Sequence, residues 1–155
     1  MARAVGLSPR RPVVVALSGG ADSVLLLHLL CASSDRPPVR AVHVDHDLRG
    51  PESREDALFC ARLCRALGVP LALRRIALEP DGPSLEARAR ELRYSVLAEE
   101  ARRVKCRTVL TGHHADDALE TVLLRWIRGA PLPALAGLRA RLVLREPEGA
   151  PPVVV

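Results

Sequence analysis

The sequence lacks any apolar run near the ~20 residues that a helix needs to cross a bilayer. Its basic start, "MARAVGLSPRRP", precedes an apolar stretch without a small-residue cleavage site, which argues against a secretory signal. Lysine is nearly absent as well, since Lys105 is the only one. We therefore expect a cytoplasmic protein with no membrane partner.

The sequence also has no C-x-x-C pair, although it contains four cysteines. A chain of this size is not a small disulfide-dense scaffold, so we expect reduced thiols. Cys60 and Cys64 stand one helical turn apart, a spacing typical of small buried side chains. We expect these cysteines to be buried rather than to bind a metal.

The net charge is +5, and arginine carries nearly all of the positive charge. Such a balance suits a polyanionic partner such as nucleic acid. The alternative is a biased composition, because Ala, Arg, Leu and Pro abound and the arginines are scattered. Charge alone leaves both interpretations open.

Short β-branched runs alternate with longer helical patterns, which predicts right-handed βαβ crossovers. The expected fold class is α/β, a doubly wound, Rossmann-like parallel sheet of about four or five strands with helices on both faces. We expect strands at Pro12–Leu17, Val39–Asp45, Pro70–Ile76 and Arg107–Thr111, and helices at Asp22–Ala32, Glu52–Leu67, Leu85–Val104 and Asp116–Arg128.

The predicted domain covers residues 12–139, between an N-terminal tail (1–11) and a turn-rich tail (140–155). The third helix should bury a stripe at helical spacing, formed by Leu85, Ala89, Leu92 and Val96.

A polar stretch interrupts the apolar run Val13–Leu30 between the first strand and the first helix. We call it the glycine loop: Ser18, Gly19, Gly20, Ala21, Asp22 and Ser23. Two glycines allow an anion to approach the backbone, and helix N–H groups and hydroxyls can then bind it. The loop has neither the lysine of a Walker A motif nor a G-x-G-x-x-G pattern. It predicts a phosphate site of another kind; an ordinary glycine turn is the alternative.

Asp22 stands among these phosphate-binding groups, which requires a cation between carboxylate and phosphate. Mg²⁺ fits, because it is a hard ion that bridges carboxylate and phosphate oxygens. The alternative is an ordinary acidic residue in the first turn of a helix.

Three further stretches converge on the same edge of the predicted sheet, where nucleotide-binding side chains should gather. They contain the second strand's end (His43, Asp45, His46), one face of the third helix (Arg90, Arg93) and the start of the fourth helix (His113, Asp117, Glu120). Each has a plain alternative: a strand-end turn, a solvated arginine face, or acids favoured by a helix dipole. A zinc site from His113, Asp117 and another histidine is a less favoured alternative.

With these residues in view, the chain resembles the N-type ATP pyrophosphatase, or PP-loop, superfamily, which has an adenine nucleotide alpha hydrolase-like fold. Within it, the chain is most similar to the tRNA(Ile)-lysidine synthetase family. The matching blocks are "LSGGADS", "VHVDHDLRG", "EARARELRY", "TGHHADDALETVLLRWIRGA" and "LAGL".

The resemblance implies an ATP-dependent ligase that adenylates the C2 oxygen of the wobble cytidine in the CAU anticodon of tRNA(Ile). Free L-lysine then displaces AMP. It implies that the glycine loop holds the phosphates that leave as pyrophosphate, and that Asp22 and Asp117 hold Mg²⁺. His113 and Glu120 would border the reacting centre, and Arg93 would contact phosphate or the activated base. A homodimer is the assembly we consider.

Two other functions stay open. A PP-loop tRNA 2-thiolation enzyme also adenylates a base, but typically needs the paired cysteines that this chain lacks. A non-catalytic ATP-binding remnant is the other, because the family continues into C-terminal domains. We expect the ending "PPVVV" to be a truncation point before those domains.

Overall fold

A computed structural model describes residues 7–45, 51–76 and 85–112 of the chain. Its centre is a parallel sheet in the order β3-β2-β1-β4, formed by Val13–Ala16 (β1), Val39–Asp45 (β2), Leu71–Arg75 (β3) and Val109–Leu110 (β4). The register pairs Val14 of β1 with Arg40 of β2 and with Val109 of β4. The predicted doubly wound α/β fold is confirmed.

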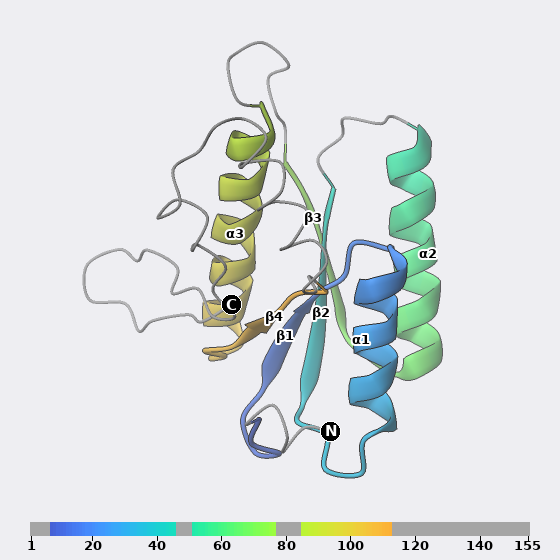
Figure 1. Ribbon diagram of the computed structural model, residues 1–155, viewed down its shortest axis with the longest axis vertical. Coiled ribbons are helices and arrows are strands. Elements are labelled where there is room, and N and C mark those ends of the chain that lie inside the picture. Colours follow the sequence, from blue (N-terminus) through green and yellow to red (C-terminus); the bar gives the residue numbers. More distant parts are fainter. Residues whose placement is uncertain (1–6, 46–50, 77–84, 113–155) are drawn as a thin grey trace, which may run out of the picture.

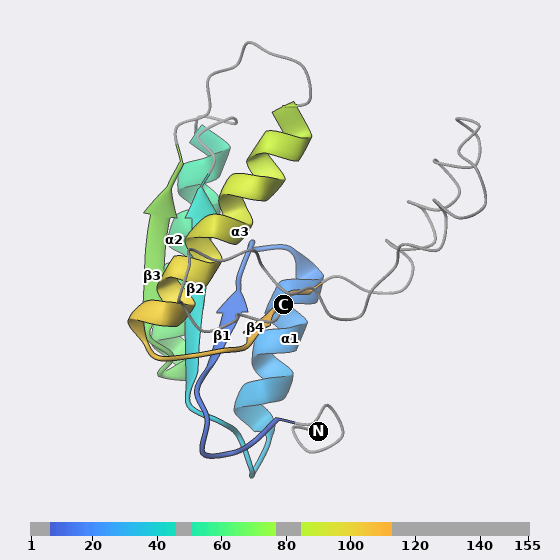
Figure 2. The ribbon, with the colours of Figure 1, turned by 90° about the vertical axis from the view of Figure 1, so that its left-hand side faces the viewer.

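Helices cover both faces of this sheet. Ala21–Ala32 (α1) and Pro51–Leu67 (α2) lie on one side, and Leu85–Arg103 (α3) lies on the other (Figure 1). Figure 2 views the α3 side and shows this helix lying over the strands. No helix in the described part of the chain is long and apolar enough to cross a membrane.

Side-chain alternation along the strands divides the core in two. Val14, Val42 and Ala72 pack with Leu97 under α3, whereas Val15, Leu17 and Ala41 pack under α1 and α2. β1 is apolar on both faces, as expected for a parallel strand between two helical layers. Its three valines are at most 2% exposed, so the strand that leads into the glycine loop is fixed on both sides.

The structure places most elements close to their predicted bounds. β2 coincides with its prediction, and β1 and β3 lie within theirs. β4 has two residues instead of five, because only Val109 and Leu110 pair with β1 within the described part. The predicted helix Asp116–Arg128 lies outside the described residues.

The predicted buried stripe of α3 is partly wrong. Ala89 is buried, but Leu92 is 39% exposed, and Leu97, Ala98 and Ala101 form the helix's contribution to the core. The shift has a physical reason: Glu100 also occupies the buried face, at 1% exposure. A buried carboxylate breaks the apolar periodicity from which a helix face is inferred.

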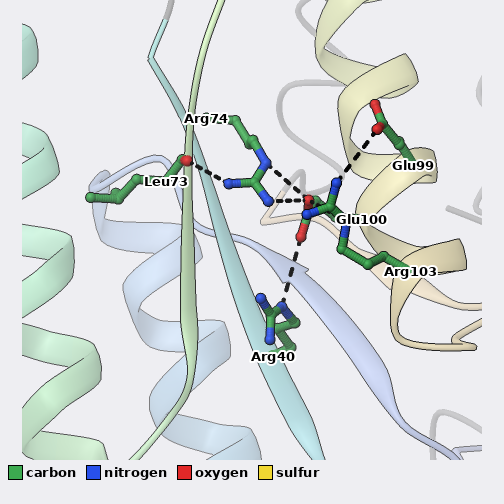
Figure 3. A network of polar contacts seen from close by, with 6 residues as sticks. All are labelled: Arg40, Leu73, Arg74, Glu99, Glu100 and Arg103. Carbon is green, nitrogen blue, oxygen red and sulfur yellow. Dashed lines mark hydrogen bonds and ion pairs between the residues drawn. The ribbon is translucent and has the colours of Figure 1, made fainter.

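Glu100 is stabilised by arginines from two strands. Its Oε1 accepts hydrogen bonds from Nε of Arg74 at 2.9 Å and from Nη2 of the same side chain. Arg40 of β2 approaches the other carboxylate oxygen at 3.8 Å. This network fastens α3 to β2 and β3 (Figure 3).

We predict that Glu100→Gln lowers the free energy of unfolding by about 3 kcal/mol, the lower end of the cost of breaking a buried ion pair. The lower end applies because Arg74 is partly exposed and can regain water. Urea unfolding measures the change. Glu99→Gln is the matched control, since Glu99 is exposed and should matter by less than about 0.5 kcal/mol. Equal effects of the two substitutions would contradict this account.

Candidate nucleotide site

The glycine loop lies at the carboxyl end of β1 and ends in the first turn of α1. Gly19 has φ +96°, a left-handed conformation that favours glycine. A side chain there would also approach Asp56 and Cys60 of α2, each at 3.6 Å. Gly20 is the N-cap of α1 and makes no side-chain cap hydrogen bond. The start of α1 thus presents backbone N–H groups at this edge of the sheet, the arrangement that binds anions.

Hydroxyl groups inside the loop hold its shape. The buried Ser23 Oγ donates to the carbonyl of Gly20 at 2.9 Å and accepts from the backbone N–H of Ser18 at 3.2 Å. The hydroxyl of Ser18 accepts from the N–H of Gly20 at 3.3 Å. Ser18 and Asp22 are exposed, whereas Ser23 is 4% exposed. The exposed pair is therefore better placed to meet a ligand than Ser23, whose proton goes to the backbone.

The buried side chain of His43 contacts the residue that precedes the glycine loop. Its ring is 4% exposed, and Nδ1 lies 2.8 Å from the carbonyl oxygen of Leu17, the residue before the loop. A carbonyl oxygen can only accept, so Nδ1 carries the proton in this hydrogen bond. The Cys60 thiol lies 3.5 Å from the same nitrogen. Sequence reasoning placed His43 among the nucleotide-binding residues, and the structure gives it a contact with the loop's entry.

The residues that follow β4 lie at the same edge of the sheet as the glycine loop. Gly112 follows β4 by two residues and lies against the first turn of α1. A Cβ there would come within 2.7 Å of the backbone nitrogen of Ser23 and 2.9 Å of the carbonyl carbon of Asp22. Such distances admit only glycine. The strand order reverses between β1 and β4, and ligands of open α/β sheets bind in the crevice at that reversal.

The remaining candidate site residues differ in their burial and in their contacts, and some of them lie outside the described residues. Asp45 is 3.5 Å from Nε of Arg75, and its side chain is only 10% exposed. Arg90 stacks over Tyr94 at 5.1 Å and is exposed, whereas Arg93 is half-buried and its Nε has no hydrogen-bond partner among the described residues. Outside the described residues lie His46, His113, Asp117 and Glu120.

Metal ligation therefore stays a prediction. The described ranges contain no group of three or more His, Cys, Asp or Glu residues that could hold a metal ion. They offer Asp22, an exposed carboxylate in the first turn of α1. One carboxylate with phosphate oxygens and waters is a usual set of ligands for Mg²⁺, so this edge fits that ion.

Three of the four cysteines are buried and poorly suited to chemistry, whereas Cys31 is only partly buried. Burial raises the pKa of the Cys60 thiol to about 12 and that of Cys64 to about 11. It also raises the pKa of Cys106, which donates to the carbonyl of Pro12 at 3.0 Å. A thiol with such a pKa is almost wholly protonated at neutral pH and is a poor nucleophile. The predicted burial of Cys60 and Cys64 is confirmed.

Two features of the site were missed by sequence reasoning. Gly112 stands in the quoted "TGHH" stretch, and a glycine at a strand end is a signal of close backbone approach. The contact between Cys60 and His43 joins α2 to β2 and had no comparable signal, because its partners are distant in sequence.

A family model described as the PP-loop domain matches residues 2–150. The chain belongs to the PP-loop domain family. It is 45% identical over 130 residues to a tRNA(Ile)-lysidine synthase of Zymomonas mobilis, covering 84% of this chain and 39% of that protein. With the enzyme of the same name from Thermus thermophilus it shares 43% over 143 residues, covering 90% and 27%. The chain thus spans about a third of the length of these curated relatives.

Solved structures show the same PP-loop fold at lower identity. The U34-tRNA thiolase NcsA of Methanococcus maripaludis superposes with a TM-score of 0.69 at 21% identity, covering 83% of this chain and 46% of that one. A glutamine-dependent NAD+ synthetase of Acinetobacter baumannii, solved with ADP, has a TM-score of 0.55 at 23% identity, covering 75% and 23%. These likenesses support the fold alone.

We predict that Gly112→Ala destabilises the protein by about 2 kcal/mol, because the new methyl group meets backbone atoms that cannot move aside. ATP–Mg²⁺ binding should weaken too, since the first turn of α1 must shift. Gly20→Ala is the control for stability: its Cβ would meet only Ser18 Oγ, at 3.5 Å, and should change stability by less than about 1 kcal/mol. Thermal unfolding measures the change in stability, and calorimetric titration measures the affinity for ATP–Mg²⁺. Wild-type values for Gly112→Ala would refute the close approach.

We predict that His43→Leu weakens ATP–Mg²⁺ binding about tenfold, because the Leu17 carbonyl loses its donor and the loop its anchor. His43→Asn should retain most of the affinity, since the asparagine amide nitrogen can donate near the position of Nδ1. His28→Leu controls for loss of an imidazole, because His28 is exposed on α1. Equal affinities of the Leu and Asn variants would show that the hydrogen bond does not position the loop.

Proposed function

We propose that this chain is the ATP-binding domain of a tRNA(Ile)-lysidine synthetase. One observation carries the proposal: the glycine loop and the N-terminus of α1 lie at the reversal of the strand order, closed on one side by Gly112. The relatives of that name, 43–45% identical to this chain, support the substrate. The proposed reaction joins lysine to the wobble cytidine of the CAU anticodon of tRNA(Ile).

The first step would form a bond between the cytidine C2 oxygen and the α-phosphorus of ATP, while pyrophosphate leaves with the electrons of the broken bond. The amine of free L-lysine would then attack C2, lose a proton, and release AMP. Such a transfer needs the reacting atoms in line and the leaving charge neutralised, so positioning and electrostatics dominate.

Residues of the glycine loop would bind the leaving pyrophosphate. Backbone N–H groups at the start of α1 supply donors there, beside the exposed side chain of Ser18. Asp22 and Asp117 would hold Mg²⁺, which when bound neutralises phosphate charge. His43 would act through Leu17 rather than on the nucleotide, since its ring is buried.

Arg93 would bind either a phosphate or the activated base. Its buried Nε lacks a hydrogen-bond partner within residues 7–45, 51–76 and 85–112, which is consistent with a group that receives its anion from a ligand. His113 and Glu120 would border the reacting centre, and Asp45 and His46 would line the nucleotide site beside the loop. The 3.5 Å ion pair between Asp45 and Arg75 supports a positioning role for this carboxylate.

The thiolation alternative finds less support. Sulfur transfer requires a reactive thiolate or a cluster held by cysteines, whereas Cys60, Cys64 and Cys106 are buried with raised pKa values. The likeness to a solved thiolase concerns the fold and adds nothing for sulfur chemistry.

The proposal is tested with the protein that carries this sequence, supplied with a tRNA(Ile) transcript, L-lysine and ATP–Mg²⁺. We expect AMP and pyrophosphate in equal amounts, and lysidine detected by mass spectrometry of the digested tRNA. Asp22→Asn should lower the rate by about 10²-fold or more, as expected for a charge-stabilising group. Asp35→Asn, in the turn before β2 at the opposite edge of the sheet, should leave the rate unchanged.

Three results would contradict the proposal. ADP and phosphate as products would mean cleavage at the wrong phosphorus. Products that form equally well without lysine would exclude the second step. ATP binding without any AMP would instead support a non-catalytic ATP-binding remnant.

A further inference from the structure

Three arginines surround one buried carboxylate on the α3 face of the sheet. Arg40 of β2, Arg74 of β3 and Arg103 of α3 approach Glu100, with Arg40 at 3.8 Å and Arg103 at 3.6 Å (Figure 3). Arg74 makes the close pair through Nε and Nη2, and its Nη1 donates to the carbonyl of Leu73 at 2.9 Å. We call Arg40, Arg74 and Arg103 the arginine cluster.

The arginine cluster holds more positive charge than its acidic partners offset, because three guanidinium groups face the two carboxylates of Glu100 and Glu99. Arg74 alone saturates Oε1 of Glu100 with two hydrogen bonds. Arg40 and Arg103 approach the carboxylate only at ion-pair distance, and within the described part of the chain neither Nε of Arg40 nor Oε2 of Glu100, which lie 3.8 Å apart, has a hydrogen-bond partner. Glu99 offsets part of the excess through a 3.9 Å contact with Arg103. Guanidinium groups crowded in this way repel one another, so a further anion would stabilise them.

The cluster is open to solvent. The side chains of Arg40, Arg74 and Arg103 are 32%, 35% and 60% exposed, although Glu100 beneath them is 1% exposed. Their inner edges are thus fixed by a buried anion while their outer edges reach water. Preorganised arginines lose little side-chain entropy when they bind a phosphate.

More cations continue from the cluster along the amino edge of the sheet. Because all four strands are parallel, the segments that precede them lie at one edge. Arg36 precedes β2, and Lys105 and Arg107 precede β4; all three are exposed. These exposed cations outnumber the exposed Asp35 at this edge, which suits a chain of phosphates better than a single small anion.

This surface is separate from the nucleotide site. The glycine loop leads into α1 on the other face. Arg74 pairs with Val44 near the carboxyl edge, but its strand lies two strands away from β1, and Arg40 pairs with Val14, four residues before Ser18. Four strand residues correspond to roughly 13 Å. An RNA whose loop reaches the nucleotide site could therefore pass its backbone over the cluster a few nucleotides away.

We propose that the arginine cluster binds a phosphate of the RNA backbone. The identity of RNA as the source rests on the proposed function, whereas the phosphate chemistry rests on the cluster itself. Contacts of this kind hold and orient an RNA without reading its sequence.

The test measures binding of an RNA hairpin with CAU in its loop, without ATP or lysine, over a range of salt concentrations. We expect the double variant Arg40→Gln, Arg103→Gln to bind about tenfold or more weakly near 0.1 M salt, and its salt slope to fall by roughly one to two. Arg54→Gln with Arg62→Gln is the matched control: both are exposed on α2, on the opposite face, and the charge change is identical. That control should lose at most about threefold, because screening limits distant charges.

Arg40→Lys with Arg103→Lys keeps the charge and should restore most of the affinity, which a loss of folding would not allow. Urea unfolding verifies that all variants are folded. Titration with inorganic phosphate separates the two sources: millimolar phosphate that binds the wild type at the cluster, with unchanged RNA affinity of the Gln variant, would overturn the RNA assignment. Equal RNA affinities of cluster and control variants would overturn the site.

Failure here is distinguishable from failure of the proposed reaction. Asp22→Asn should lower turnover by about 10²-fold or more, yet bind the hairpin as the wild type does, because Asp22 lies on α1, in the other helical layer. A cluster that binds RNA in a protein that forms no lysidine would keep this inference and reject the proposed function.

Discussion

The approach of β4 to the first turn of α1 fixes the position of everything else at the nucleotide edge. The chain winds β1, β2 and β3 in one direction and then returns to place β4 beside β1. At this return, backbone meets backbone: a single added carbon on Gly112 would lie 2.7 Å from the nitrogen of Ser23. The backbone N–H groups at the start of α1 are therefore positioned by the winding of the sheet.

The polar groups at this edge divide into two sets by burial. The buried set, His43 and Ser23, directs its protons to the carbonyls of Leu17 and Gly20 and so holds the loop. The exposed set, Ser18 and Asp22, stands at the surface together with the N-terminus of α1. Buried donors that are satisfied by protein acceptors give rigidity, because leaving either partner unpaired would cost desolvation energy. Rigid support behind exposed donors is the arrangement that charge stabilisation requires.

Most of the fold could be predicted from local patterns. β-branched runs and helical spacing located β1, β2, β3 and all three helices to within about two residues, since these signals depend on near neighbours in sequence. The glycine loop followed from its place between a strand and a helix. Gly112 could not be assigned its role in this way, because its contact depends on β4 lying beside β1, which is a property of the complete sheet. The buried face of α3 was misjudged for a related reason: Glu100 is buried only because Arg74 comes from another strand to neutralise it.

The structure distinguishes between two explanations of the arginine content, a biased composition and a polyanionic partner, which composition alone leaves open. A biased composition would scatter arginines over solvated surfaces, as Arg54 and Arg62 are on α2. It does not account for three arginines from β2, β3 and α3 directed at one carboxylate that is 1% exposed. Three guanidinium groups face only two carboxylates, Glu100 and Glu99, so one positive charge of this network repels the others unless it meets a further anion. The position of these side chains, more than the net charge of +5, supports the proposed polyanionic partner.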